Sequence, residues 1–359
     1  MRTARHIVGR RALAALFTVG AVTVAAACGS SSGSSDTAAD SGTGDLTIVA
    51  STNVWGAVAE AVAGDGVTVE SLIRDPSADP HSYEASASDA AELTDADLVV
   101  VNGGGYDSFA TSFVADRDSS TVVDVSALVA GQAGHDAASE NSGTAAAAAT
   151  TTADDHDHDH ASETAGADDH AEDDHAGHDH SDPSTNEHYW YDPTIVAAVA
   201  NDIADKLAGL DAAEADTYRA NAAQFVDSLS AVTAQLESIA ARHSGAQVLQ
   251  TEPVATRMLL AAGLDDVTPG EFQNAIEDGS DPSAASLAET EALASSPDVR
   301  ALVYNTQTTD AVTTRIRSTA EAAGLPIVEV TETLPDGVSF VDWQLAAATA
   351  LGNALDTER

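Results

Sequence analysis

The chain has 359 residues, of which 43% are hydrophobic, which is enough for one large or two medium domains with a core. Its 58 acidic residues against 14 basic ones give a net charge of −44, which argues against binding nucleic acid or an anionic membrane surface and suits the attraction of cations. An acidic surface is equally typical of a GC-rich genome or a salty habitat, so the charge alone assigns no function.

The first 28 residues resemble a bacterial lipoprotein signal. Basic residues up to Arg11 precede an apolar run from Ala12 to Ala27, which is short for a membrane-spanning helix and ends in small residues at Cys28. This order predicts export, acylation of Cys28 and a lipid anchor in the outer face of the cytoplasmic membrane. The alternative is an ordinary secretory signal with an incidental cysteine. Residues 29–44, rich in Gly, Ser and Ala, predict a flexible tether.

From residue 45 onward, short apolar runs alternate with helical patterns. Strands are expected at 46–50, 67–73, 97–101 and 121–125, with helices at 54–62, 86–93 and 106–115. Strands that alternate with helices favour parallel βαβ packing. These elements, with a helix that follows Pro193 and extends to residue 210, predict an N-terminal lobe over residues 45–210.

Residues 131–187 interrupt this lobe. They contain no Val, Ile, Leu, Phe, Tyr or Trp, so they cannot build a core, and a disordered insertion is expected in the absence of metal. Imidazoles bind zinc, copper or nickel, and neighbouring carboxylates raise the local cation concentration. An auxiliary metal site of low affinity is therefore predicted here, with a solvated acidic linker as the alternative. The histidines predicted to form this auxiliary site are His156, His158, His160, His170, His175, His178 and His180.

A long helix is expected over residues 211–243, where apolar residues recur three and four positions apart. It would extend on the order of 50 Å, enough to link two lobes. A second βα series then predicts a C-terminal lobe over residues 244–359. Its strands are expected at 247–250, 301–304 and 327–330, and its helices at 253–262, 283–294, 309–323 and 338–355. The predicted fold is α/β, with two Rossmann-like lobes of mostly parallel sheets joined by one long rigid helix.

Candidate metal ligands follow the predicted strands, where such folds place their binding sites. His81 lies in the segment Asp79–Glu84 after one strand, and Glu252 and Glu332 each directly follow another. His188 closes the insertion. Imidazole and carboxylate ligands together suit first-row divalent ions. Taken singly, each residue is more typical of a solvated loop or, for the two glutamates, of a helix cap.

Several motifs occur in order over roughly residues 45–355: Asp79-Pro80-His81-Ser82-Tyr83-Glu84, the turn Asn102–Tyr106, the His-rich insertion, His188-Tyr189-Trp190-Tyr191-Asp192-Pro193 and the uninterrupted helix. Together they resemble the solute-binding proteins of zinc and manganese ABC importers, the periplasmic zinc-binding (ZnuA-like) family. The resemblance implies two α/β lobes bridged by a rigid helix, with one metal ion between them. It also implies that His81 and His188 are the first two ligands.

The other two ligands that the resemblance implies depart from the zinc-type pattern. Glu252 occupies the position where zinc-type members have His and manganese-type members can carry Glu, and Glu332 stands where Asp is usual. Two histidines and two carboxylates leave open whether the ion is zinc, which the His-rich insertion favours, or manganese or iron. Protonation of the histidines is expected to weaken binding near pH 5–6.

The implied function is that of the extracytoplasmic component of an ABC importer. The protein would be a monomer that captures zinc and delivers it to a membrane permease driven by a cytoplasmic ATPase. The alternative is an extracellular metal buffer or adhesin without transport, which shares every sequence feature. A secreted zinc hydrolase is disfavoured, because the sequence contains no HExxH motif or nucleophile elbow and four protein ligands leave little room for a reacting water.

Overall fold

The computed structural model describes residues 46–131 and 185–358. Cys28, the tether 29–44 and the seven histidines from His156 to His180 lie outside these ranges, so the lipid anchor and the auxiliary site stay predictions from the sequence. Within the described ranges, no helix combines the length and apolar character needed to cross a membrane.

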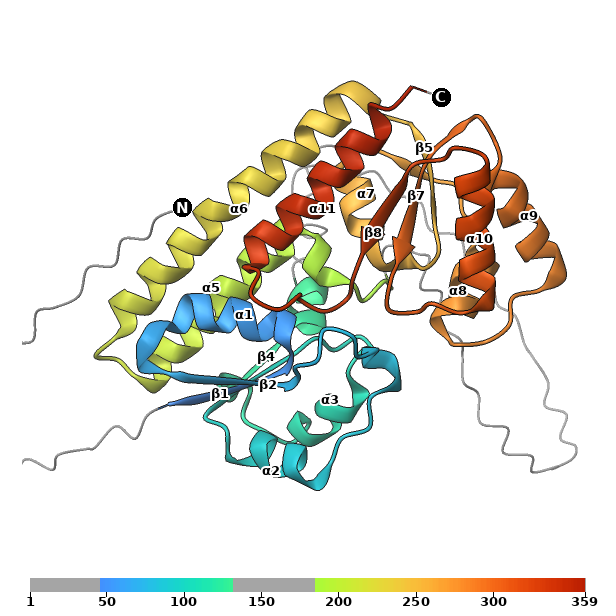
Figure 1. Cartoon of the computed structure of the whole chain (residues 1–359). Coiled ribbons are helices and arrows are strands. Elements are labelled where there is room, and N and C mark those ends of the chain that lie inside the picture. The colour runs from blue at the N-terminus through green and yellow to red at the C-terminus, as the bar shows by residue number, and fades with distance from the viewer. Residues whose placement is uncertain (1–45, 132–184, 359) are drawn as a thin grey trace, which may run out of the picture. The chain divides into compact units, whose positions relative to one another are not determined.

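The first lobe is built on a four-stranded parallel sheet with the order β2-β1-β3-β4. Its strands are β1 (Thr47–Thr52), β2 (Thr68–Ile73), β3 (Leu98–Val101) and β4 (Val122–Asp124). Figure 1 shows α1 (Asn53–Ala63) and α5 (Pro193–Leu210) on one face, and α2 (Ala87–Asp95) and α3 (Ser108–Val114) on the other. Residues 125–131 are also helical. Because side chains alternate along a strand, Ile48 and Ala50 pack toward α1, whereas Val49 packs toward α2 and α3.

The second lobe repeats this plan with a parallel sheet in the order β6-β5-β7-β8. Its strands are β5 (Gln247–Gln250), β6 (Asp265–Asp266), β7 (Val299–Asn305) and β8 (Ile327–Val330). Its helices are η5 (Pro253–Ala255), α7 (Thr256–Ala261), α8 (Gly270–Glu277), α9 (Ala284–Ala294), α10 (Ala311–Ala322) and α11 (Phe340–Leu355). In Figure 1, α11 covers one face of this sheet, and α8, α9 and α10 cover the other.

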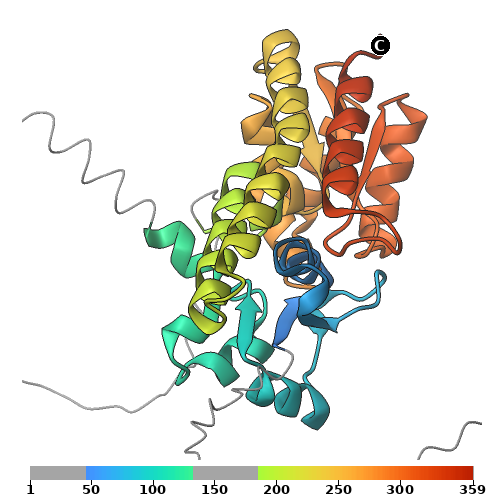
Figure 2. The ribbon, with the colours of Figure 1, turned by 90° about the vertical axis from the view of Figure 1, so that its left-hand side faces the viewer.

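Helix α6 (Ala215–His243) joins the lobes and packs along both of them (Figure 2). Its seven buried residues are spaced three and four apart: Tyr218, Ala222, Phe225, Leu229, Val232, Leu236 and Ile239. These side chains belong to one hydrophobic core that also contains Ile48 of β1 and Val248 of β5. A core that continues through the linking helix opposes a wide hinge motion, because separating the lobes would expose apolar surface.

The structure confirms the predicted class of two α/β lobes with parallel sheets. Two elements of the second lobe were not predicted, the short strand β6 and the helix α8. The linking helix begins at Ala215 rather than at residue 211, because the backbone N–H of Asp211 bonds the carbonyl of Leu207 and ends α5.

Candidate metal site

His81 is placed by a short turn that follows β2. The turn is the 3₁₀ helix η2 (Pro80–Ser82), and the side chain of Asp79 caps it by accepting a hydrogen bond of 2.9 Å from the backbone N–H of His81. A proline at the first helical position sets the backbone for this turn. The imidazole lies edge-on to the ring of Tyr106, with 4.9 Å between the ring centroids. The side chain of His81 is 23% exposed.

His188 is fully buried at the start of the 3₁₀ helix η4 (Tyr189–Tyr191). Its backbone N–H donates to Asn186 Oδ1 at 3.1 Å, and its ring lies edge-on to Trp190 with 5.3 Å between centroids. Asn186 Nδ2 in turn donates to the carbonyl of Pro253 at 2.8 Å, which fixes this segment to the second lobe. Asn186 and Glu187, which the sequence assigned to the insertion, are therefore buried parts of the folded structure.

Glu332 directly follows β8 and reaches the two histidines from the second lobe. Its Oε2 lies 3.3 Å from His81 Nε2 and 3.7 Å from His188 Nε2. The same oxygen accepts a hydrogen bond of 3.3 Å from the hydroxyl of Tyr106. The candidate ligand atoms of His81, His188 and Glu332 all lie within 4.8 Å of one another. The structure thus brings together three of the four predicted ligands.

Glu277, at the end of α8, also reaches this cluster, and sequence reasoning missed it. Its Oε1 lies 3.1 Å from His81 Nε2 and 3.3 Å from His188 Nε2, and its side chain is 2% exposed. The buried Glu187 also lies near His81. Its carboxylate, the carboxylate of Glu277 and the imidazole of His81 offer ligand atoms within 4.8 Å of one another.

Glu252, the predicted third ligand, is buried nearby but forms no ion pair with either histidine among the described residues. Its Oε2 accepts a hydrogen bond of 2.6 Å from Asn305 Nδ2 and another from the hydroxyl of Thr308. It does not cap η5 with its side chain. Asn305 Nδ2 also donates to Glu332 Oε1 at 2.8 Å, so the amide links the two carboxylates.

Burial and charge act against each other at the ionisable groups of the cluster. Burial alone would lower the pKa of His188, but the nearby Glu277 and Glu332 raise it to about 10. The pKa of His81 is raised well above its usual value by the same carboxylates, again against the effect of burial. Burial alone would raise the pKa of Glu332 and Glu277, yet contacts with the histidines lower that of Glu332 to about 2 and hold that of Glu277 well below its usual range.

The pKa of Glu252 moves in the opposite direction. Burial raises it well above its usual value, and the charges of Glu332 and Glu277 raise it further. Glu252 thus differs from Glu332 and Glu277, whose pKa values are lowered by the histidines.

Gln307, in the loop after β7, forms hydrogen bonds with both the loop that precedes His81 and the loop that contains Glu332. Its Nε2 donates to the carbonyl oxygens of Pro76 at 3.1 Å and Ala78 at 2.9 Å, and its Oε1 accepts from the backbone N–H of Glu332. Loops that carry ligands from different lobes are thus held together by one side chain.

We expect Gln307→Ala to weaken metal affinity about 10- to 100-fold, the usual effect of removing a group that orients ligands. Competition with a chromophoric chelator measures this. Gln224→Ala is the matched control, because Gln224 is an exposed residue of the linking helix α6. An equal loss of affinity in both variants would contradict the orienting role of Gln307.

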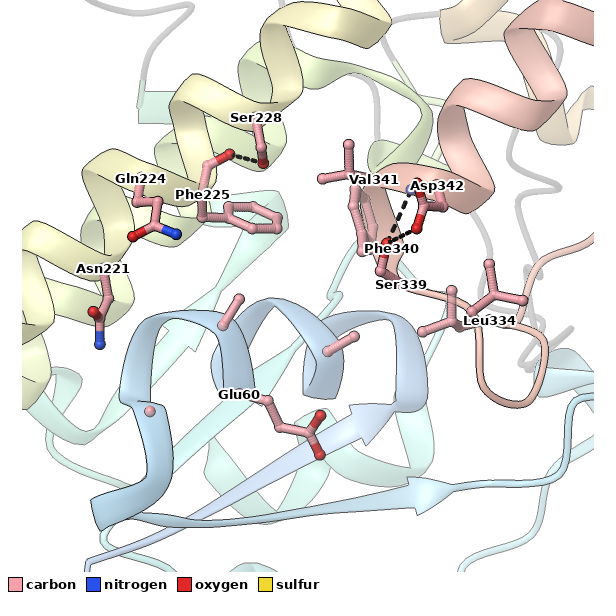
Figure 3. A pocket seen from close by; sticks show the side chains of 14 residues that line it. Glu60, Asn221, Gln224, Phe225, Ser228, Leu334, Ser339, Phe340, Val341 and Asp342 are labelled. Carbon is pink, nitrogen blue, oxygen red and sulfur yellow. Dashed lines mark hydrogen bonds between the residues drawn. The ribbon is translucent and has the colours of Figure 1, made fainter.

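A separate surface cavity lies away from this cluster. Its volume is about 790 Å³, and it is lined by α1, α6 and the start of α11, as Figure 3 shows. Its polar lining side chains include Glu60, Asn221, Gln224 and Asp342, and no histidine lines it. The metal-ligating chemistry of the described residues is therefore in the buried cluster between the lobes.

Comparison with known proteins identifies solved structures of the same fold. The solute-binding protein FpvC of Pseudomonas aeruginosa, solved in complex with Mn²⁺, is 18% identical, with 87% of this chain and 98% of that chain covered and a TM-score of 0.60. A metal-free point mutant of the periplasmic metal-binding protein of Candidatus Liberibacter asiaticus is 16% identical over 87% of this chain and 100% of that chain, with a TM-score of 0.59. At these identities the likeness shows the fold. A search of curated protein sequences found no match.

The family comparison is more specific. Residues 48–354 match the model of the family described as zinc-uptake complex component A, periplasmic. This span contains both lobes, the linking helix, His81, His188 and Glu332. The family consists of metal-binding transport proteins rather than enzymes, and its members are extracytoplasmic. The chain belongs to the family of the periplasmic zinc-uptake complex component A.

Proposed function

We propose that the protein captures one zinc ion between its lobes and delivers it to the permease of an ABC importer. The observation that carries this proposal is the convergence of His81 and His188 with Glu332 of the second lobe, with ligand atoms within 4.8 Å of one another. Two imidazole nitrogens with carboxylate oxygens suit zinc. We further propose that acylated Cys28 anchors the protein outside the cytoplasmic membrane and that a cytoplasmic ATPase drives uptake.

Manganese is the alternative ion, with iron admitted by the same ligands. The P. aeruginosa protein FpvC is described in complex with Mn²⁺ and with Ni²⁺, and the Candidatus Liberibacter asiaticus protein has a Cd-bound form. Several buried carboxylates close to the histidines are compatible with manganese, which prefers oxygen ligands. Elemental analysis of protein purified from a mixed-metal medium distinguishes these ions.

We expect His81→Ala to weaken zinc binding at least ~100-fold, because the variant loses a nitrogen ligand and leaves Glu277 and Glu332 without one of their partners. Chelator competition measures the affinity, on protein lacking residues 132–184 so that the insertion does not contribute. His243→Ala is the matched control, since His243 pairs with Asp356 at 2.8 Å, away from the cluster. Tight binding that survives in His81→Ala would refute the proposed site.

Transport is tested separately from binding. A strain that lacks the protein should grow poorly when zinc is limiting and recover when zinc is added. A metal buffer or adhesin without transport predicts normal growth of that strain in zinc-limited medium. The same experiment with manganese limitation shows which ion the importer serves.

A further inference from the structure

We infer that Glu277, at the end of α8, is the fourth ligand of the captured ion, and that Glu252 is a positioning residue. This inference rests on the proposed function, because it concerns the ion held by His81, His188 and Glu332. In this set Glu277 of α8 takes the place of Glu252, which lies in the loop after β5 and was predicted as a ligand. None of the motifs described above includes a residue of α8.

The nitrogen–oxygen distances of the cluster are close to those between ligands of one ion. An ion with bonds of about 2.0–2.2 Å separates its tetrahedral ligand atoms by about 3.3–3.6 Å. In the structure, Glu277 Oε1 lies 3.1 and 3.3 Å from the Nε2 atoms of His81 and His188, and Glu332 Oε2 lies 3.3 and 3.7 Å from the same atoms. Glu277 is therefore as close to both histidine nitrogens as Glu332 is.

The hydrogen bonding of Glu277 also favours a cation in this cluster. Its Oε1 and the Nε2 of His188 are buried and lie 3.3 Å apart, but neither has a partner in hydrogen-bonding geometry within the part of the chain that the structure describes. Buried polar atoms without partners are costly, and a bound ion would satisfy Oε1 and Nε2 together. Two carboxylates and two neutral imidazoles would also balance the charge of a divalent ion.

The carboxylate of Glu252 is hydrogen-bonded to partners other than the histidines. Both Asn305 Nδ2 and the Thr308 hydroxyl donate to its Oε2. The second proton of Asn305 Nδ2 goes to Oε1 of Glu332 at 2.8 Å, which leaves Oε2 of Glu332 facing the histidines. Glu252 therefore acts through Asn305, by orienting a ligand that it does not replace.

The ligand set names the class of ion. Four protein ligands, two nitrogen and two oxygen, suit zinc, whereas manganese prefers more oxygen ligands and a higher coordination number. Glu277 is then the residue that closes the coordination shell around zinc.

The test compares Glu277→Gln with Glu252→Gln, which have the same size as the native residues and each remove one carboxylate. Glu271→Gln is the control, because Glu271 is an exposed residue of the same helix, α8. Zinc affinity is measured by chelator competition, and Co²⁺ is used as a probe because its visible absorption reports tetrahedral coordination. We expect a loss of at least ~100-fold and altered Co²⁺ bands for Glu277→Gln, and a loss below ~10-fold with native bands for Glu252→Gln.

The reverse result, with native bands in Glu277→Gln and a large loss in Glu252→Gln, would overturn the inference while leaving the proposed function intact. Failure of the proposed function is recognised differently, because the wild-type protein itself would then bind no zinc tightly. If Glu277→Gln does not fold, Glu277→Asp replaces it. The shorter carboxylate should fold and give weakened zinc binding with changed Co²⁺ bands, and native affinity and bands in Glu277→Asp would count against ligation.

Discussion

Zinc affinity should rise with pH by up to ~100-fold per pH unit through neutrality, because binding one ion displaces up to two protons. The pKa of His188 is raised to about 10, so its ring is protonated at pH 7 in the ion-free protein, and the same carboxylates raise the pKa of His81 well above its usual value. Protons therefore compete with the ion well above the range of pH 5–6 that ordinary histidines predict. For His188 this competition continues to about pH 10.

Two measurements check this prediction. Chelator competition between pH 6 and 8 gives the slope of affinity against pH, and calorimetry in buffers with different heats of ionisation counts the protons released. The variant His243→Ala should keep the wild-type slope, because His243 is remote from the cluster. An affinity that is constant above pH 7 would mean that the histidines are neutral and would contradict the prediction.

The stability of the ion-free protein is a second readout of the same contacts. The pKa of His188 is raised from 6.5 to about 10, so its contribution is complete below pH 6.5 and is lost as the pH rises through 10. The pKa of Glu332 is lowered from 4.5 to about 2, so its contribution is present above pH 4.5 and is lost as the pH falls through 2. Both contributions are complete between pH 4.5 and pH 6.5, so urea unfolding should show the highest stability of the ion-free protein in this range.

The second large effect is expected at Trp190, whose ring packs against those of His188 and Tyr106. Trp190→Ala should lower the free energy of unfolding by about 3–5 kcal/mol, the usual cost of removing a buried aromatic side chain. Trp190 is 1% exposed, and its ring centroid lies 5.0 Å from that of Tyr106 and 5.3 Å from that of His188. The variant should also bind zinc more weakly, because His188 and Tyr106 lose the surface that orients them.

Trp190→Phe separates packing from hydrogen bonding. The indole Nε1 of Trp190 has no hydrogen-bond partner within residues 46–131 and 185–358, so phenylalanine removes no bond and keeps an aromatic ring. We expect less than half the loss of stability that alanine causes, as measured by urea unfolding with and without zinc. Equal and small losses in the two variants would show that the packing of Trp190 contributes little.

Periodicity and strand ends predicted much of the site. His81 and Glu332 follow strands of different sheets, β2 and β8, whose apolar runs are plain in the sequence, and in each parallel sheet the carboxyl ends of the strands lie along one edge. Glu252 also follows a strand, but its direction depends on Asn305 and Thr308, which lie more than fifty residues away in the sequence. A strand end locates the backbone and does not determine which neighbour the side chain contacts.

Glu277 could not be predicted as a site residue from the sequence, for a different reason. Helix α8 has eight residues, and its buried apolar side chains are Phe272 and Ile276, which is too few to establish a helical period. An acidic residue at the end of an unpredicted helix cannot be distinguished by sequence from the many exposed acidic residues of this chain. Packing of α8 against the second sheet, a tertiary effect, brings Glu277 to the histidines.

In the proposed site, the unequal exposure of the ligands sets the order in which a bound ion exchanges them. His81 is 23% exposed, whereas the side chains of His188, Glu277 and Glu332 are 0–2% exposed. A competing ligand from outside therefore meets the bond to His81 first and reaches the other three bonds only after that one has opened. Release becomes a stepwise ligand exchange with a fixed starting point, and its rate depends on how readily the loop Asp79–Ser82 yields.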